Sequence, residues 1–186
     1  MSDLTTLILR QTETRQRQVA TTLASVTELL AQAAERLLEA CLNGQRIFLC
    51  PLPGAQPLAE RATSLLLRGM IQPRPGLPVI LLHPLAGEDS GCAPRLASLA
   101  APGDILLLFN CGRQDDAEPT IGAGQALDMR LIMLGAPLPP GLVDRWHPED
   151  LLIALDTPCP ATMHEAALAA VHALCNALDH RLLGLA

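Results

Sequence analysis

The chain has 186 residues, a formal net charge of −6 and a hydrophobic fraction of 49%, with only 2% aromatic residues. This length suits one domain with a substantial core, and the core must be aliphatic because so few rings are available. An acidic chain lacks the basic surface that nucleic-acid phosphates attract, so we expect no direct binding of nucleic acid. We therefore expect a single domain over residues 1–186.

None of the six cysteines belongs to a C-x-x-C pair, so the sequence gives no support to a structural zinc site. Most of them lie within apolar segments, where a cysteine acts as a small buried hydrophobe. The first stretch is too polar for a signal peptide, and no apolar run approaches the ~20 residues that span a membrane. We expect a reduced, cytoplasmic protein that does not enter a membrane.

The longest helical pattern runs from Asp3 to Asn43, with apolar residues at steps of three and four. Asn43 and Gly44 form a good stop signal. The polar stretch from Gln11 to Gln18 is a place where we expect a break or bend. Because so long an amphipathic helix carries more apolar surface than one small domain needs, part of it is expected to pack on another subunit. The sequence thus predicts a homo-oligomer, with a tetramer as the expected form.

Short apolar segments alternate with helical patterns after residue 44. We expect strands at residues 47–50, 79–82, 105–109, 130–134 and 151–155. We expect helices from residue 55, near 93–100, near 120–128 and from 160 to about 183, with an irregular proline-rich segment at 136–150. This alternation predicts an α/β fold with a parallel, doubly wound sheet. A helical region at 1–44 then precedes an α/β core at 45–186.

The most informative stretch follows the first predicted strand. A buried strand, a short turn with Gly54 and a helix form the arrangement that places small-molecule sites at the carboxyl end of a parallel sheet. A phosphate loop of this kind needs glycines, hydroxyls and free N–H groups. Here Pro51 and Pro53 have no N–H group, and no Ser or Thr lies between Cys50 and Arg61. The strand–turn–helix arrangement of a phosphate site is present, but the hydroxyl and N–H groups that would bind the phosphate are missing.

Several segments resemble the sugar isomerase (SIS) domain family, in the branch of phosphoheptose isomerases and DiaA-like proteins. The likeness covers nearly the full length and rests on the segments NGQRIFLC, RPGLPVILL, APGDILLLF, MRLIML and HEAALAAVHALCNALDHRLL. It implies a three-layer αβα sandwich with a five-stranded, flavodoxin-like parallel sheet and a long N-terminal helical region.

The resemblance also locates two ligand loops, and both depart from the family pattern. The family's Gly-Asn-Gly-Gly/Thr-Ser loop falls on residues 51–55, where only Gly54 matches and Ala55 takes the place of the sugar-binding Ser. The phosphate loop, Ser-Thr-Ser/Arg-Gly-Asn-Ser, falls on residues 110–115, where every hydroxyl is gone. Asp115 and Asp116 are expected to repel a phosphate there. The remaining loop candidates are Asn110, Cys111, Gly112 and the single basic residue Arg113.

The heptose isomerases of this family also carry a zinc set of His, Glu, Gln and His. By position the first His falls on Arg61, the Glu on Leu65 and the Gln on His164, and the second His is retained as His172. His164 and His172 are the candidate metal ligands, and they lie about 80° apart around a helix. Two imidazoles without a carboxylate make a poor zinc site, so we expect no cofactor. Glu165 and His172 are the remaining catalytic candidates.

Two functions from different classes remain open. The resemblance to DiaA implies a non-catalytic, oligomeric protein-binding factor, with the replication initiator DnaA as a possible partner. The alternative is a divergent phosphoheptose isomerase or sugar-phosphate-binding protein. The chain ends with Leu182, Leu183 and Leu185, which either finish a buried helix stripe or form an exposed contact patch for a protein partner.

Overall fold

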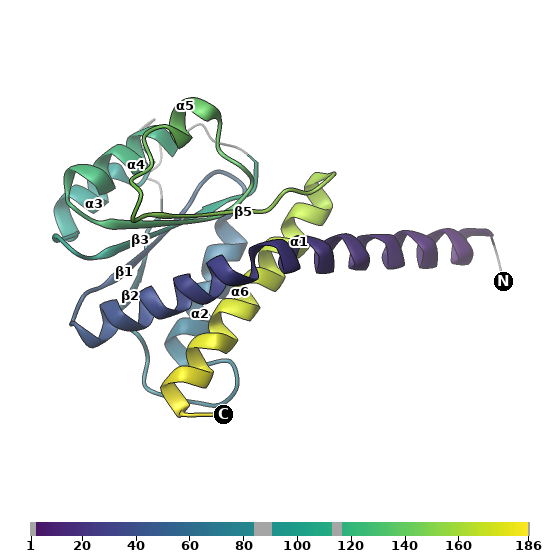
Figure 1. Cartoon of the computed structure of the whole chain (residues 1–186), viewed down its shortest axis with the longest axis horizontal. Coiled ribbons are helices and arrows are strands. Elements are labelled where there is room, and N and C mark those ends of the chain that lie inside the picture. The colour runs from purple at the N-terminus through teal and green to yellow at the C-terminus, as the bar shows by residue number, and fades with distance from the viewer. Residues whose placement is uncertain (1–2, 84–90, 113–116, 186) are drawn as a thin grey trace.

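Five parallel strands form the centre of the molecule in the computed structural model, which describes residues 3–83, 91–112 and 117–185 (Figure 1). The strands are β1 (Ile47–Pro51), β2 (Val79–Leu81), β3 (Ile105–Asn110), β4 (Arg130–Gly135) and β5 (Leu151–Ala154). Their order across the sheet is β2-β1-β3-β4-β5, and every neighbouring pair is parallel. The predicted α/β fold with a flavodoxin-like parallel sheet is confirmed.

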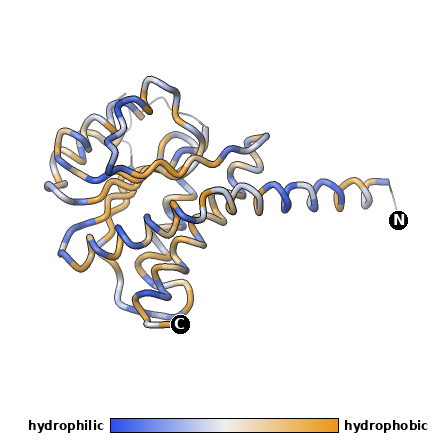
Figure 2. Tube along the Cα trace, in the orientation of Figure 1, coloured by the Kyte–Doolittle hydropathy of each residue, from blue (hydrophilic) through white to orange (hydrophobic). Residues whose placement is uncertain are grey.

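Helices cover both faces of this sheet (Figure 1). One face packs against α1 (Asp3–Leu42), α2 (Gln56–Arg68) and α6 (Pro160–Leu183). The other packs against α3 (Ala93–Leu99) and α4 (Ala117–Ala126), beside the single turn α5 (Pro140–Val143). Because β1 and β3 are covered on both sides, all their residues are buried, which explains their continuous apolar sequences (Figure 2).

The expected break in the first helix is wrong, because α1 runs without interruption through residues 11–18. Arg and Gln are good helix formers, so polarity alone does not end a helix. Arg17 also pairs with Glu13 one turn earlier at 3.6 Å, and the Thr14 hydroxyl donates to the Arg10 carbonyl at 2.8 Å. The predicted stop is confirmed: Gly44 adopts φ 73°, and its N–H donates to Cys41.

The first turns of α1 extend away from the sheet as an arm (Figure 1). Leu4, Leu7 and Ile8 on this arm are 69%, 50% and 62% exposed. None of the helices in the described ranges is both long enough and apolar enough to cross a membrane.

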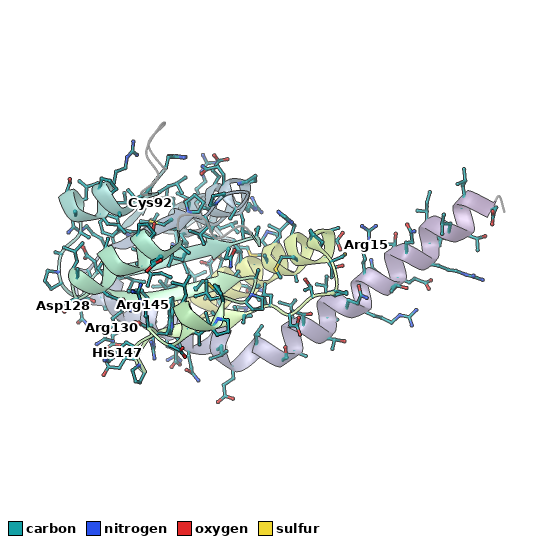
Figure 3. All side chains as sticks on the ribbon, turned by 90° about the horizontal axis from the view of Figure 1, so that it is seen from above. Arg15, Cys92, Asp128, Arg130, Arg145 and His147 are labelled. Atoms are coloured by element: carbon teal, nitrogen blue, oxygen red, sulfur yellow. The ribbon has the colours of Figure 1, made fainter. Side chains whose placement is uncertain are left out.

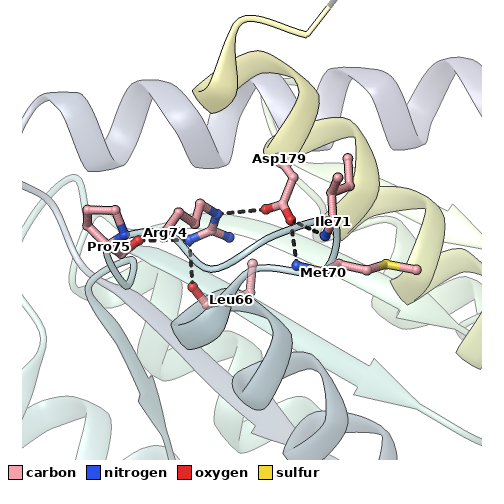
Figure 4. Close-up of polar contacts among 6 residues, drawn as sticks. All are labelled: Leu66, Met70, Ile71, Arg74, Pro75 and Asp179. Atoms are coloured by element: carbon pink, nitrogen blue, oxygen red, sulfur yellow. Dashed lines mark hydrogen bonds and ion pairs between the residues drawn. The ribbon is translucent and has the colours of Figure 1, made fainter.

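A buried ion pair joins the loop after α2 to the last helix (Figure 4). Arg74 Nε donates to Asp179 Oδ1 at 2.6 Å, and the side chains are only 3% and 0% exposed. Asp179 Oδ2 accepts the N–H groups of Met70 at 2.5 Å and Ile71 at 2.9 Å. Burial acts to raise the pKa of the Asp179 carboxyl, but the N–H groups and the guanidinium outweigh it and hold that pKa below its ordinary value.

Replacing Asp179 with Asn is expected to lower the free energy of unfolding by about 3 kcal/mol, because it leaves the Arg74 guanidinium buried without its counter-ion. The depressed pKa predicts stability that is present above about pH 4 and is lost as the pH falls through the folded-state pKa. The variant should lack this component of acid sensitivity. Urea unfolding of both proteins at pH 3 to 7 measures it.

The matched control is Glu35→Gln, which removes an exposed pair with Arg181 whose N–O distance is 3.9 Å. That pair lies in water, so its loss should leave the unfolding curve unchanged. Equal destabilisation by the two substitutions would contradict a special role for Asp179.

Candidate functional site

The candidate site lies at the carboxyl edge of the sheet, where the neighbouring strands β2, β1 and β3 end. Parallel strands all end at this edge, and ligands of open α/β sheets bind in the crevice beyond it. The predicted ligand-loop positions after β1 and the described ones after β3 do fall here. Arg113, Asp115 and Asp116 lie outside the described residues.

In the loop after β1, backbone N–H groups form hydrogen bonds within the protein. The N–H of Leu52 donates to Phe109 on β3 at 2.9 Å, and the N–H of Ala55 donates to the Leu52 carbonyl at 2.9 Å. The side chains of Leu52 and Ala55 are buried, so they anchor the loop to the core. Two N–H groups of this loop are already hydrogen-bonded, and its two prolines have none. Few N–H groups therefore remain to bind a phosphate.

The loop after β3 is tied down by Asn110, which is completely buried. Its Nδ2 donates to the Ala136 carbonyl at 2.8 Å, and its Oδ1 accepts the Gly112 N–H at 2.9 Å. Burial raises the pKa of the neighbouring Cys111 thiol, so this thiol is protonated rather than an activated nucleophile. The described part of this loop therefore has a structural role.

The predicted metal ligands do not come together. His164 Nδ1 lies 2.8 Å from the Pro160 carbonyl, within the first turn of α6. His172 Nε2 instead accepts a hydrogen bond from Arg61 Nε at 3.4 Å. Arg61 stands where the family has its first histidine, and a fixed positive charge there opposes a divalent cation. Leu65, in the position of the carboxylate, is buried in the core.

No group of three or more His, Cys, Asp or Glu side chains is placed to hold a metal ion within the described part of the chain. The other catalytic candidate, Glu165, forms an ion pair with Arg15 of α1 at 3.4 Å. Glu165 and His172 therefore each have a basic partner. Neither contact forms the acid–base pair that an isomerase needs.

A polar trio at the same edge was missed by the sequence analysis. Gln56 Nε2 donates to Glu60 Oε1 at 2.8 Å and lies 2.8 Å from His83 Nδ1. Gln56 and Glu60 are one turn apart on α2, and His83 follows β2. If the amide donates to both, His83 Nδ1 is an acceptor and the proton of the tautomer lies on Nε2. The i, i+4 spacing of Gln56 and Glu60 was the only signal in the sequence.

A hollow of about 430 Å³ lies near the start of β4, at the opposite edge of the sheet (Figure 3). Two of its charged side chains, Arg145 and Asp150, are engaged by the protein itself. Arg145 donates to Glu118 at 2.6 Å, and the Asp150 carboxylate accepts the N–H groups of Leu131 at 2.8 Å and His147 at 3.2 Å. These bonds fasten the segment between α5 and β5, so we assign the hollow a structural role.

His172 should titrate below the ordinary histidine pKa, because burial and the Arg61 charge both disfavour the imidazolium. Replacing Arg61 with Gln removes the positive charge and should raise the pKa of His172. Proton NMR of the imidazole resonances from pH 5 to 8 measures both values. The exposed His164 serves as an internal reference, and an unchanged His172 pKa in the variant would contradict the contact.

Comparison with known proteins agrees with the fold and with the resemblance. No family model matches the chain. A phosphoheptose isomerase from Thiobacillus denitrificans is 28% identical over 166 residues, which cover 83% of this chain and 84% of the relative. The DnaA initiator-associating protein DiaA from Photorhabdus laumondii is 25% identical over 182 residues, with 92% of each chain covered.

Solved structures show the same architecture. The phosphoheptose isomerase from Francisella tularensis superposes with a TM-score of 0.81 at 24% identity, over 97% of this chain and 100% of the other. The phosphoheptose isomerase GmhA from Neisseria gonorrhoeae gives 0.78 at 19% identity, over 95% and 98%. Structural likeness at this identity shows the fold, and the sequence matches carry the relationship further. The chain therefore has the fold of the phosphoheptose isomerase structures and is similar in sequence to phosphoheptose isomerases and to DiaA.

Proposed function

We propose that this protein is a non-catalytic SIS-domain protein that works as an oligomeric protein-binding factor. The observation that carries the proposal is the Arg61–His172 contact beside the buried Leu65. A guanidinium and a hydrocarbon side chain occupy the positions where an isomerase of this branch carries a metal ligand and a carboxylate. The proposal treats residues 1–186 as one domain in the cytoplasm, where the thiols stay reduced.

The proposed assembly is a homo-oligomer, with a tetramer as its expected form, and its support is the arm of α1. Leu4, Leu7 and Ile8 follow the i, i+3, i+4 spacing of one helix face, and all three are exposed. An exposed apolar face of this kind marks a contact site. A shallow hollow of about 190 Å³ between α1 and α6, lined by Leu23 and Ala173 among others, offers further apolar surface. A second copy of the chain is the proposed occupant of these surfaces.

The proposed partner surface lies at the carboxyl end of α6. Leu182 and Leu185 are 36% and 41% exposed, and Leu183 is half-buried. Met70 and Ile71 are also exposed, and their N–H groups bind Asp179, one turn before Leu182. These exposed apolar side chains are the proposed contact surface. The name of the DiaA relative, a DnaA initiator-associating protein, suggests DnaA as the partner.

Replacing Leu182 and Leu185 with Ser should abolish capture of DnaA from the native host while leaving the melting temperature and the mass by light scattering unchanged. The reason is that both side chains are exposed, so their packing contributes little to the fold. Leu99→Ser on α3 is the matched control, since Leu99 is 46% exposed and lies under the other face of the sheet. A fall in melting temperature or mass would instead mean that the leucines are structural.

A second candidate is a divergent phosphoheptose isomerase or sugar-phosphate-binding protein, and the comparisons favour it more than the first. Three curated relatives at 27–29% identity are phosphoheptose isomerases, and one at 25% is DiaA. The polar trio of Gln56, Glu60 and His83 is the described feature that best suits a sugar hydroxyl. It does not supply the family's metal set.

We expect no turnover of sedoheptulose 7-phosphate, with or without added zinc. Loss of a single proton-transferring group already costs typically 10²–10⁴ in rate, and here the carboxylate position is Leu65. Isothermal calorimetry with the same sugar phosphate separates the two candidates. Micromolar binding without turnover would support a sugar-phosphate-binding protein, and turnover that disappears in His172→Ala would establish an isomerase.

A further inference from the structure

A polar hollow of about 370 Å³ lies where the middle of α1 passes the segment between β5 and α6 (Figure 1). We call it the threonine hollow, and its lining residues are Thr14, Arg17, Gln18, Thr21 and Thr22 of α1, with Asp156 and Pro158 from the other segment. Its volume falls in the range of about 300–1,000 Å³ that small-molecule sites occupy. Because β5 is the edge strand beyond β4, the hollow lies apart from the candidate site at β2, β1 and β3.

Two hydrogen bonds hold the walls of the threonine hollow in place. The hydroxyl of the buried Thr22 donates to the backbone carbonyl of Asp156 at 3.2 Å. The hydroxyl of Thr162, which is fully buried, donates to Gln18 Oε1 at 3.4 Å. Both bonds join α1 to the chain on either side of the start of α6, so the two walls are tied to each other.

Three polar groups of the hollow have no hydrogen-bond partner in the part of the chain that the structure describes. They are the Thr21 hydroxyl, the Gln18 Nε2 and the Asp156 carboxylate. An amide nitrogen donates, a carboxylate accepts, and a hydroxyl does both. The hollow thus offers donors from α1 and an acceptor from the opposite wall to one small molecule.

The charges and shapes of the lining residues narrow the class of ligand. The Asp156 carboxylate repels a phosphate, and the Arg17 side chain is 78% exposed and already pairs with Glu13 at 3.6 Å. No aromatic side chain stands among the described lining residues, so a nucleobase finds no ring on which to stack. An apolar ligand would cover the three free polar groups without bonding them, which costs free energy. A neutral molecule with several hydroxyl groups remains.

We propose that the threonine hollow binds a neutral polyol of the size of a monosaccharide. The Asp156 carboxylate accepts from two neighbouring hydroxyl groups of the sugar, Gln18 Nε2 donates to a third, and the Thr21 hydroxyl bonds a fourth. Because Thr21 and Asp156 are exposed and the hollow is open on one side, we expect a millimolar dissociation constant. The site uses no residue of the proposed partner surface, so it is independent of the proposed function.

Saturation-transfer NMR on the native full-length protein tests the proposal with glucose, galactose and fructose, each beside its 6-phosphate. We expect saturation transfer to at least one free sugar and weaker transfer to its phosphate ester. Thr21→Val should weaken binding of that sugar by roughly three- to tenfold, because it removes one hydroxyl at nearly constant shape. Asp156→Asn should narrow the difference between the sugar and its ester, since an amide does not repel a phosphate.

Thr12→Val is the matched control, because it makes the same change at an exposed position of α1 outside the hollow. It should leave binding unchanged, and the melting temperatures of the variants should agree with that of the wild type. Absence of transfer to all three free sugars, or tighter binding of the phosphate esters, would overturn the proposal. So would a signal that survives Thr21→Val and is lost in His83→Ala, because the sugar would then lie at the polar trio.

Discussion

Burial of β1 and β3 on both faces is the constraint on which the other elements depend. A strand without a solvent face needs helices on both sides, and α1, α2 and α6 cover one side while α3 and α4 cover the other. Since the aromatic content is only 2%, leucine and alanine must fill the layers. Close packing then requires small residues where helices approach, as at Ala166, Ala167 and Ala170 of α6, which are fully buried.

At the carboxyl edge of the sheet, the ends of β3 and β4 are held together by contacts within the protein. The Asn110 side chain joins β3 to the residue after β4 by a hydrogen bond. Gly135 lies so close to Asn110 that a Cβ atom at Gly135 would fall 1.8 Å from the Asn110 carbonyl oxygen. Gly135 also adopts φ 138°, a region that other residues avoid. These groups fix the carboxyl ends of β3 and β4 to each other. A phosphate site needs the opposite arrangement, with N–H groups and hydroxyls left free for the ligand.

Most of the fold could be predicted from the sequence, because continuous apolar runs such as residues 105–109 have few alternatives to a buried strand. The continuity of α1 could not be judged from polarity alone, although the i, i+4 spacing of Glu13 and Arg17, which pair in the helix, is readable in the sequence. The Arg74–Asp179 pair joins residues far apart in the chain, and no local pattern announces it. The sequence placed Asn110 in a loop, but its hydrogen bond to the residue after β4 could be predicted only once the order of the strands was known.

The candidate site stays a prediction, although the surroundings of several of its residues can be compared with the structure. Matching to the family placed Arg61 and His172 in one metal set, and the structure shows them in contact, although as donor and acceptor rather than as ligands. The same matching passed over His83, because no family motif includes it. A shared scaffold therefore fixes where a site lies but not what it does, since the loops change more freely than the strands that carry them. In this chain the sheet resembles that of the phosphoheptose isomerase structures, while proline, leucine and arginine stand at the positions that the resemblance matches to the family's ligand and metal motifs.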